Sequence, residues 1–231
     1  MGRFEPIEAG LEGSVAGLDE AGRGALAGPV SVGLVVFPPA FFASAPDSDE
    51  ARFLAALDDS KKLSPAARER LLPEVYRFAA FASCVMMSSK VVDRMGINPA
   101  TEQAMILLVR RAAKALGAEP GAWSASRGGL TLLVDGNYRF HRLPAEPAVR
   151  AVRTEIKGDS RIASIAAASI LAKVLRDRRM DRFDRIFPGY GFAVHKGYGT
   201  ELHRRSMARL GLTPAHRKSY GSQLSLFDDS P

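Results

Sequence analysis

The sequence predicts an α/β domain built on a mixed β-sheet. Two apolar runs near the N-terminus, residues 14–19 and 29–37, have the composition of β-strands and are joined by a short glycine-rich turn. Segments with helical periodicity then alternate with further apolar runs, which is the pattern of an α/β domain. A hydrophobic content of 46% over 231 residues is enough for a substantial core.

The first helix is expected after an irregular insertion at residues 37–50. Its start is marked by Ser64, a good N-cap, and by a proline at the first helical position. Pro73 is a potential break in this helix. The apolar run at residues 79–89 then predicts a buried strand.

A second helix is predicted over residues 98–117, with Asn98 as its cap, Pro99 as its first residue and Gly117 as its end. Residues 130–135 and 149–156 follow as strands.

A long helix is expected from about Ser160 to Arg182, with an unusual number of small side chains on one face. Small side chains let a helix approach its neighbour closely, so this helix should lie hard against the sheet. The small residues are Ala163, Ser164, Ala166, Ala167, Ala168 and Ser169.

The domain organisation follows from these patterns. Residues 1–185 are expected to form the main α/β domain, residues 186–220 a basic helical C-terminal extension, and residues 221–231 a flexible tail.

The charge balance favours a polyanionic partner, with nucleic acid first among the candidates. Thirty-two Lys and Arg residues stand against twenty-five Asp and Glu residues, which gives a formal charge of +7. We expect no membrane association, because no apolar segment approaches the roughly 20 residues needed to cross a bilayer. The single cysteine, Cys84, cannot form an internal disulfide, so a cytoplasmic location is expected.

Four carboxylates are candidates for chemistry, although each has an ordinary explanation when taken alone. Asp19 and Glu20 precede a glycine-rich loop and could be surface turn residues. Asp135 precedes Gly136 in a common turn signal, and Asp159 could cap the helix that follows it.

Taken together, the same acids predict a metal site. Asp19 and Asp135 each end an apolar strand and Asp159 follows another, and such positions meet at one edge of an α/β sheet. Crowded carboxylates repel one another unless a cation lies among them. Since all the ligands would be oxygens, Mg²⁺ or Mn²⁺ is favoured over Zn²⁺. With a polyanionic partner, the implied chemistry is phosphodiester hydrolysis by two metal ions.

Five segments together resemble the signature of bacterial ribonuclease HII. They are GLDEAGRGALAGPV, DSKKLS, LLVDGNY, KGDSRIASIAAASILAKVLRD and HKGYGT, in that order. The resemblance implies a ribonuclease H-like fold, with a five-stranded mixed sheet flanked by helices and a helical C-terminal extension. It also implies a metal-dependent endonuclease that cuts the RNA strand of RNA–DNA hybrids, and cuts duplex DNA on the 5′ side of a single embedded ribonucleotide, leaving 5′-phosphate and 3′-hydroxyl ends.

The resemblance also implies residue roles. Asp19, Glu20, Asp135 and Asp159 would be the catalytic, metal-binding acids. The loop Gly22, Arg23 and Gly24 would read the ribose 2′-hydroxyl, since its low bulk lets the backbone approach a sugar. Tyr198 would pack on the following deoxyribose, and Lys61 and Lys62 would contact phosphate or orient groups near the metal site.

The basic segments 203–209 and 216–219 lie where a grip on the duplex backbone is expected, and His195, His203 and His216 could join those contacts without a catalytic role. As an alternative, basic residues of this kind can simply form a solvated helix face. In the tail, Gln223, Leu224, Leu226 and Phe227 resemble the short peptide with which bacterial repair proteins bind the sliding clamp. We expect a monomer.

Two other interpretations are open at this point, and a third, a related family, is disfavoured. The related ribonuclease HIII is disfavoured, because only about 18 residues precede Asp19 and because Arg23 suits the HII type. A junction resolvase would share the acids and the positive charge but would need no sensor for a 2′-hydroxyl. A non-catalytic adaptor for duplex and clamp would make the acids dispensable.

Overall fold

A computed structural model of the chain describes residues 4–5, 7–11, 13–117 and 129–220. Its centre is one five-stranded sheet in the order β3-β2-β1-β4-β5. Strands β1 and β2, and β2 and β3, are antiparallel, whereas β4 runs parallel to both β1 and β5. The sheet is therefore mixed, as the sequence predicts. The strands are β1 (Ser14–Ala21), β2 (Val30–Val36), β3 (Phe81–Met87), β4 (Leu130–Asp135) and β5 (Val149–Glu155).

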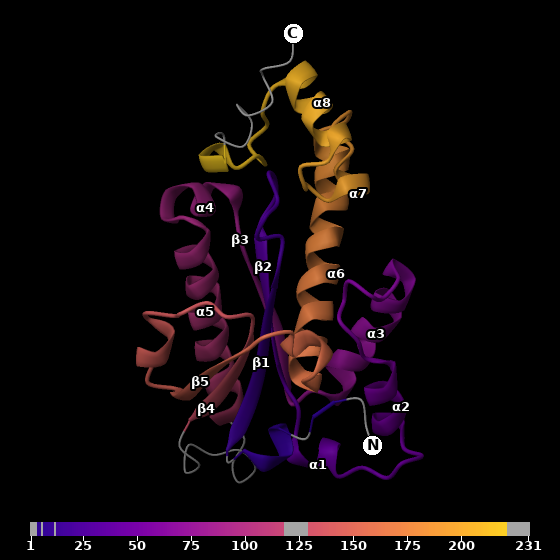
Figure 1. The fold of residues 1–231 in the computed structure, drawn as a ribbon, viewed down its shortest axis with the longest axis vertical. Coiled ribbons are helices and arrows are strands. Elements are labelled where there is room, and N and C mark those ends of the chain that lie inside the picture. The colour runs from indigo at the N-terminus through magenta and orange to yellow at the C-terminus, as the bar shows by residue number, and fades with distance from the viewer. Residues whose placement is uncertain (1–3, 6, 12, 118–128, 221–231) are drawn as a thin grey trace.

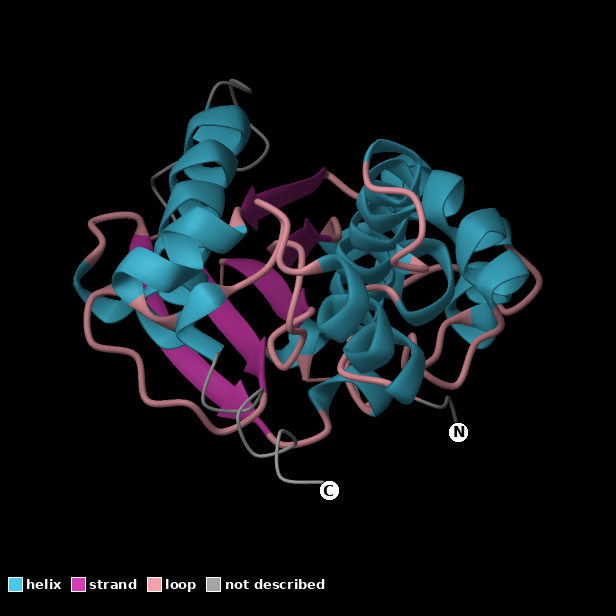
Figure 2. Ribbon diagram, turned by 90° about the horizontal axis from the view of Figure 1, so that it is seen from above, coloured by secondary structure: helices cyan, strands magenta, loops and turns pink. Residues whose placement is uncertain are grey.

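Helices cover both faces of this sheet (Figures 1 and 2). The α-helices are α1 (Pro39–Phe42), α2 (Asp49–Ala56), α3 (Pro65–Phe78), α4 (Ser89–Met95), α5 (Ile97–Gly117), α6 (Ala163–Ile186), α7 (Phe192–His195) and α8 (Glu201–Leu210). Short 3₁₀ turns lie at Glu8–Gly10, Leu143–Ala145, Gly158–Ser160 and Lys218–Tyr220. None of the described helices is both long and apolar enough to cross a membrane.

The two long helices pack on opposite faces of the sheet in different ways. Helix α5 meets β2 and β3 through large aliphatic side chains such as Met105, Leu108 and Val109, all fully or almost fully buried. Helix α6 instead brings its backbone against the sheet, because a Cβ atom added at Gly17 of β1 or Gly33 of β2 would overlap backbone atoms of Ser164 or Ala168. The close approach predicted from the small residues of this helix is thus confirmed.

Several predicted element boundaries are wrong in detail. Residues 37–50 are not wholly irregular, since Ser48 caps α2 by accepting a hydrogen bond from the Ala51 amide. Helix α3 continues through Pro73 without ending there. Helix α4 has no counterpart in the prediction, and α5 begins at Ile97, so that Asn98 lies inside its first turn instead of capping it.

The C-terminal extension stands at one end of the sheet, beside the end of α6 (Figure 1). Its apolar cluster joins Tyr190, Phe192 and Met207 to Met180 of α6 and to Leu26 from the loop after β1. The extension therefore packs against the glycine-rich loop. Its division from the main domain at residue 185 stays a prediction.

Candidate active site

Strand β1 presents its two acids on opposite faces of the sheet. Gly17 faces α6, so Asp19, two residues further along the strand, faces α6 as well. Glu20 therefore points to the α5 side, where it lines a cavity of about 420 Å³ together with Asp135, Thr101 and Met105. Strand β1 continues to Ala21, so Asp19 lies inside the strand and not at its predicted end.

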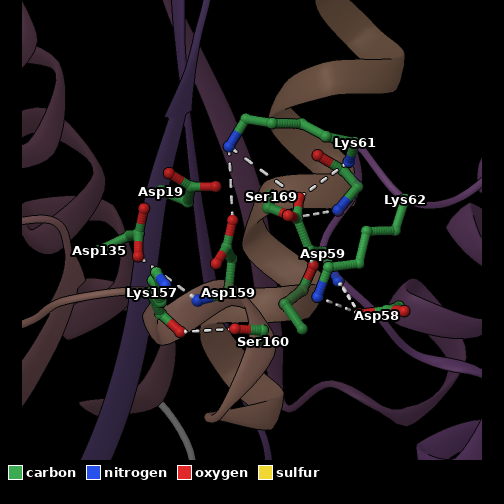
Figure 3. Close-up of polar contacts among 12 residues, drawn as sticks. Asp19, Asp58, Asp59, Lys61, Lys62, Asp135, Lys157, Asp159, Ser160 and Ser169 are labelled. Atoms are coloured by element: carbon green, nitrogen blue, oxygen red, sulfur yellow. Dashed lines mark hydrogen bonds and ion pairs between the residues drawn. The ribbon is translucent and has the colours of Figure 1, made fainter.

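Three of the predicted acids converge on the α6 side of the sheet. One carboxylate oxygen from each of Asp19, Asp135 and Asp159 lies within 4.8 Å of the others (Figure 3). The parallel pairing of β4 with β1 places Val134 opposite Leu18, and this register brings the next residue, Asp135, beside Asp19. Glu20 is not part of this triad. It lines the cavity on the other face of the sheet, and Asp135 lines that cavity as well.

A tight turn after β5 places Asp159. Lys157 adopts a left-handed conformation (φ 56°), and the amides of Gly158 and Asp159 donate to Asp135 Oδ1 at 2.8 and 3.4 Å. Helix α6 begins only at Ala163, after an N-cap that makes no side-chain hydrogen bond. Asp159 consequently faces the other acids and does not cap this helix.

Burial and crowding make Asp19, Glu20 and Asp159 harder to ionise. Burial raises the pKa of Asp19 well above its usual range, and the charges of Glu20 and Asp135 raise it further. Burial also raises the pKa of Glu20 and of Asp159, to which Asp135 adds its repulsion. Carboxylates crowded in this way are stabilised by a divalent cation.

The two lysines of the DSKKLS segment lie differently with respect to this cluster. Lys61 Nζ is 3.4 Å from Asp159 Oδ2 and 4.0 Å from Asp59 Oδ1. Burial alone would lower the pKa of Lys61, but the carboxylates of Asp19 and Asp159 raise it above its usual value. Lys62 pairs instead with Asp58, at 3.6 Å (Figure 3).

The glycine-rich loop follows β1 directly and lies beside the acids. Gly22 has a positive φ of 87°, and a side chain there would overlap the buried guanidinium of Arg176. At Gly24 an added Cβ would meet open space. The Arg23 side chain bonds to Asn98 Oδ1, lies 4.0 Å from Glu20 Oε1 and has its guanidinium carbon 5.7 Å from the centre of the Tyr138 ring.

Tyr198, between α7 and α8, lies near this loop, because Arg176 contacts both the Tyr198 ring and the backbone position of Gly22. Its ring is partly exposed (37%), with the guanidinium carbon of Arg176 at 5.2 Å and Lys173 Nζ at 5.9 Å from the ring centre. The aromatic ring is thus held by cations of α6 while part of it stays open to a ligand.

The histidines of the extension are not available to phosphate, which corrects one expectation. His195, His203 and His216 are buried; the ring of His195 stacks on that of His203, and the Nε2 atoms of His203 and His216 lie 3.1 Å apart. Burial and the neighbouring His195 lower the pKa of His203 to about 4. Because charged forms of these rings would be poorly solvated, they serve as neutral packing groups.

Arg217, within the predicted basic segment 216–219, is also buried and binds backbone carbonyls instead of facing the solvent. Sequence reasoning missed Arg217, Arg176, Asn98 and Tyr138 as parts of this region. The clamp-like peptide with Gln223, Leu224, Leu226 and Phe227 lies outside the described residues.

Comparison with solved structures places the fold. The RNase HII in its complex with PCNA from Archaeoglobus fulgidus matches with a TM-score of 0.70 and 26% identity, over 94% of this chain and 98% of that one. An RNase HIII solved with Mn²⁺ matches with a TM-score of 0.60 and 20% identity, over 95% and 73% of the two chains. The fold is the ribonuclease H-like one, and with its cluster of acids it defines a metal-dependent nuclease.

Sequence comparison narrows this class. The family model for ribonuclease HII matches residues 16–222. Ribonuclease HII of Mycobacterium tuberculosis is 46% identical over 208 residues, covering 90% of this chain and 68% of its own. That of Rhodococcus opacus is 43% identical over 220 residues, covering 95% and 84%. The chain belongs to the ribonuclease HII family and is a hydrolase with ribonuclease H endonuclease activity.

Proposed function

We propose that this nuclease hydrolyses the RNA strand of RNA–DNA hybrids and cuts on the 5′ side of single ribonucleotides in duplex DNA, leaving 5′-phosphate and 3′-hydroxyl ends. The observation that carries the proposal is the adjacency of the acids Asp19 and Glu20 to the loop Gly22–Arg23–Gly24 in one strand-to-loop segment. A sensor for the 2′-hydroxyl must lie close to the cleaved phosphodiester, because the 5′-phosphate and the 2′-hydroxyl belong to the same nucleotide.

The donor set fits divalent metal ions. Asp19 and Asp159 are buried, Asp135 is half-buried, and all three offer only carboxylate oxygens within 4.8 Å of one another. Glu20 adds a fourth carboxylate on the other face of β1. We assign Asp19, Glu20, Asp135 and Asp159 as the residues that hold two ions, Mg²⁺ or Mn²⁺. When bound, such ions supply Lewis acidity and offset the negative charge of the reacting phosphate.

The remaining residues orient the substrate. Lys61 contacts Asp159 and brings a positive charge to the edge of the acid cluster, where a phosphate oxygen would approach. Lys62, paired with Asp58, lies further from the acids and is suited to a flanking phosphate. The loop Gly22–Arg23–Gly24 reads the 2′-hydroxyl, and Tyr198 packs on the deoxyribose that follows.

A cleavage assay tests this proposal. The substrate is a duplex with one embedded ribonucleotide, compared with the same duplex made wholly of DNA, with Mg²⁺ or Mn²⁺ and with a chelator. We expect cutting at the 5′ side of the ribonucleotide only, and none with the chelator. Equal cutting of the all-DNA duplex would instead favour a junction resolvase, and metal-independent binding without cutting would favour an adaptor.

The tail supports a separate proposal about partners. The segment Gln223, Leu224, Leu226 and Phe227 is suited to insertion into a hydrophobic pocket of a sliding clamp, and the Archaeoglobus fulgidus RNase HII forms a complex with PCNA. Deleting residues 221–231 should abolish clamp binding in a titration and leave cleavage unchanged. Unchanged clamp affinity would refute it. We also propose that the enzyme acts as a monomer, which sedimentation of the full chain tests.

A further inference from the structure

Arg217 lies beneath the glycine-rich loop and holds its backbone. Its Nη2 donates to the carbonyl of Gly22 at 2.7 Å, its Nη1 to that of Arg23 at 2.8 Å, and its Nε to that of Gly28 at 3.1 Å. The residue is only 1% exposed. One planar guanidinium therefore fixes both ends of the loop, which a lysine ammonium on its flexible stem could not do equally well.

A second buried guanidinium supports the far end of the loop. Arg176 of α6, fully buried, donates through Nε to the Pro29 carbonyl at 3.0 Å and through Nη2 to the Ala27 carbonyl at 3.2 Å. Together the two arginines engage five loop carbonyls. These belong to Gly22, Arg23, Ala27, Gly28 and Pro29.

This arrangement fixes where the loop amides point. In a trans peptide, the carbonyl of one residue and the amide of the next point in opposite directions. Since the carbonyls of Gly22 and Arg23 are turned toward the buried Arg217, the amides of Arg23 and Gly24 are turned away from it. In the described part of the chain neither amide donates to a protein acceptor, whereas the amides of Leu26, Ala27 and Gly28 are bonded to Gly197 or Ala215.

The two free amides belong to Arg23 and Gly24, the central residues of a tight turn. A 3.3 Å hydrogen bond from the Ala25 amide to the Gly22 carbonyl closes this turn. The space around Gly24 is open, as an added Cβ there would have no neighbour within 4 Å. Two unpaired backbone donors of the described chain thus lie in the loop that follows the acids Asp19 and Glu20, in a position suited to a sugar hydroxyl or a phosphate oxygen.

We propose that Arg217 is a positioning residue for ribose recognition, because it sets the direction of the Arg23 and Gly24 amides through their preceding carbonyls. The inference rests on the proposed function, in which this loop reads the 2′-hydroxyl. The inference gives the segment after α8 a role in substrate specificity, although that segment lies almost 200 residues from the loop in the sequence.

Tyr220 completes the support. Its hydroxyl donates to the Arg23 carbonyl at 3.0 Å, and its ring centre lies 5.3 Å from the guanidinium carbon of Arg217. The segment itself is anchored to α4, where Asp93 accepts hydrogen bonds from the amides of Lys218 and Ser219. A change at Tyr220 should therefore act on the same carbonyl with a smaller effect.

The test compares two conservative variants with a matched control. Arg217→Lys keeps the charge, and Tyr220→Phe keeps the ring and removes one hydroxyl. Arg178→Lys is the control, because Arg178 is exposed on α6 and pairs with Glu69. Single-turnover cleavage is measured on a duplex with one ribonucleotide and on the same all-DNA duplex, beside the affinity for the all-DNA duplex and the unfolding midpoint.

We expect Arg217→Lys to slow cleavage at the ribonucleotide by about 100-fold, the size of effect that a misplaced contact produces. Loss of one hydrogen bond in Tyr220→Phe should slow it by about 5-fold. Affinity for all-DNA duplex should stay within about 2-fold of wild type for every variant, because the phosphate contacts that dominate it are untouched. Arg178→Lys should match the wild type throughout.

Each failure has a separate meaning. A wild-type enzyme that cuts all-DNA duplex as readily overturns the proposed function and the inference with it. A wild-type preference for the ribonucleotide that both variants retain in full overturns the inference alone. So does an equal loss of cleavage and of all-DNA affinity, since that would show a general structural role. If Arg217→Lys does not fold, Tyr220→Phe decides by the same criteria.

Discussion

Two walls of the site bury charge in opposite ways. On one wall, Asp19 and Asp159 face Asp135, and burial and mutual repulsion raise the pKa of both Asp19 and Asp159. On the other, Arg176 and Arg217 are as deeply buried, but backbone carbonyls receive their hydrogen bonds. Most guanidinium donors of the basic wall are bonded to backbone carbonyls, although Arg176 Nη1 has no hydrogen-bond partner among the described residues and burial lowers the pKa of Arg176 to about 10. The acidic wall gathers carboxylates whose mutual repulsion a divalent cation would relieve.

The largest contrast should appear when a charge is removed from the acidic wall. Asp135→Asn keeps an oxygen that can accept the Gly158 amide, so the fold should be preserved. Cleavage should fall by about 1,000-fold or more, equivalent to about 4 kcal/mol of transition-state stabilisation. Single-turnover assays measure the rate, and urea unfolding in chelator should show unchanged or greater stability. Near-normal cleavage would contradict the metal assignment.

Removing a charge from the basic wall should have the opposite consequence for stability. Arg176→Met leaves the carbonyls of Ala27 and Pro29 without their donor in a buried place. We expect a loss of about 3 kcal/mol in the free energy of unfolding, as for other broken buried networks. The matched control Arg178→Met, on the exposed side of α6, should cost less than about 1 kcal/mol. If urea unfolding showed the same loss of free energy for Arg176→Met and Arg178→Met, the buried hydrogen bonds of Arg176 would have no special stabilising role.

Protonation of the histidine cluster should destabilise the extension as the pH falls. Burial lowers the pKa of His203 to about 4, below its usual value near 6.5. Above pH 6.5 the ring is neutral in both the folded and the unfolded chain, so its full contribution is present. Between pH 6.5 and 4 only the unfolded chain takes up the proton, and stability should decline by up to about 2 kcal/mol at pH 5.

The groups facing His203 do not change this sign. They are the rings of His195 and His216, whose pKa values burial also lowers, and the Tyr198 carbonyl. Asp184 raises the pKa of His195 without outweighing its burial. His203→Gln should flatten the decline in unfolding stability from pH 7 to 5, while His141→Asn, at an exposed position, should leave it intact. A steeper decline in His203→Gln would count against the assignment.

The smallest predicted effect is stabilisation of the acidic wall by its ions. Mg²⁺ or Mn²⁺ at about ten times its dissociation constant should stabilise the wild type by about 1.4 kcal/mol, since it binds only the folded cluster. The thermal midpoint, measured by calorimetry with metal and with chelator, reports the effect. In Asp159→Asn the shift should shrink markedly, and a full shift there would place the ions elsewhere.

The sequence was sufficient for the mixed sheet and for the convergence of Asp19, Asp135 and Asp159, while the catalytic role of these acids and of Glu20 stays a prediction. Strands and their order of appearance follow from apolar runs, and Asp135 and Asp159 could be placed beside Asp19 because parallel strands bring their ends to one edge. Pairing of β1 with β4 does this in the structure. The alternation of side chains along a strand also places Glu20 on the other face of β1, although we did not predict this separation from the sequence.

Roles that depend on long-range contacts could not be predicted. Asn98 has the local signature of a helix cap, yet α5 begins one residue before it, at Ile97, and the Asn98 side chain instead binds Arg23. The histidines and Arg217 belong to a basic run, and nothing local distinguishes a solvated arginine from one folded under a distant loop. The division at residue 185, the substrate contacts and the clamp peptide stay predictions.

The backbone contact of α6 with β1 and β2 has a consequence for sequence divergence. At Gly17 and Gly33 the obstacle to a side chain is helix backbone, which cannot rotate aside as a side-chain tip can. Even a methyl group at either position would push α6, and Asp159 just before it, away from Asp19. These two glycines therefore set the distance between α6 and the sheet, and with it the distance between Asp159 and Asp19. A distant relative with bulkier residues at both positions would need a different separation between its acids.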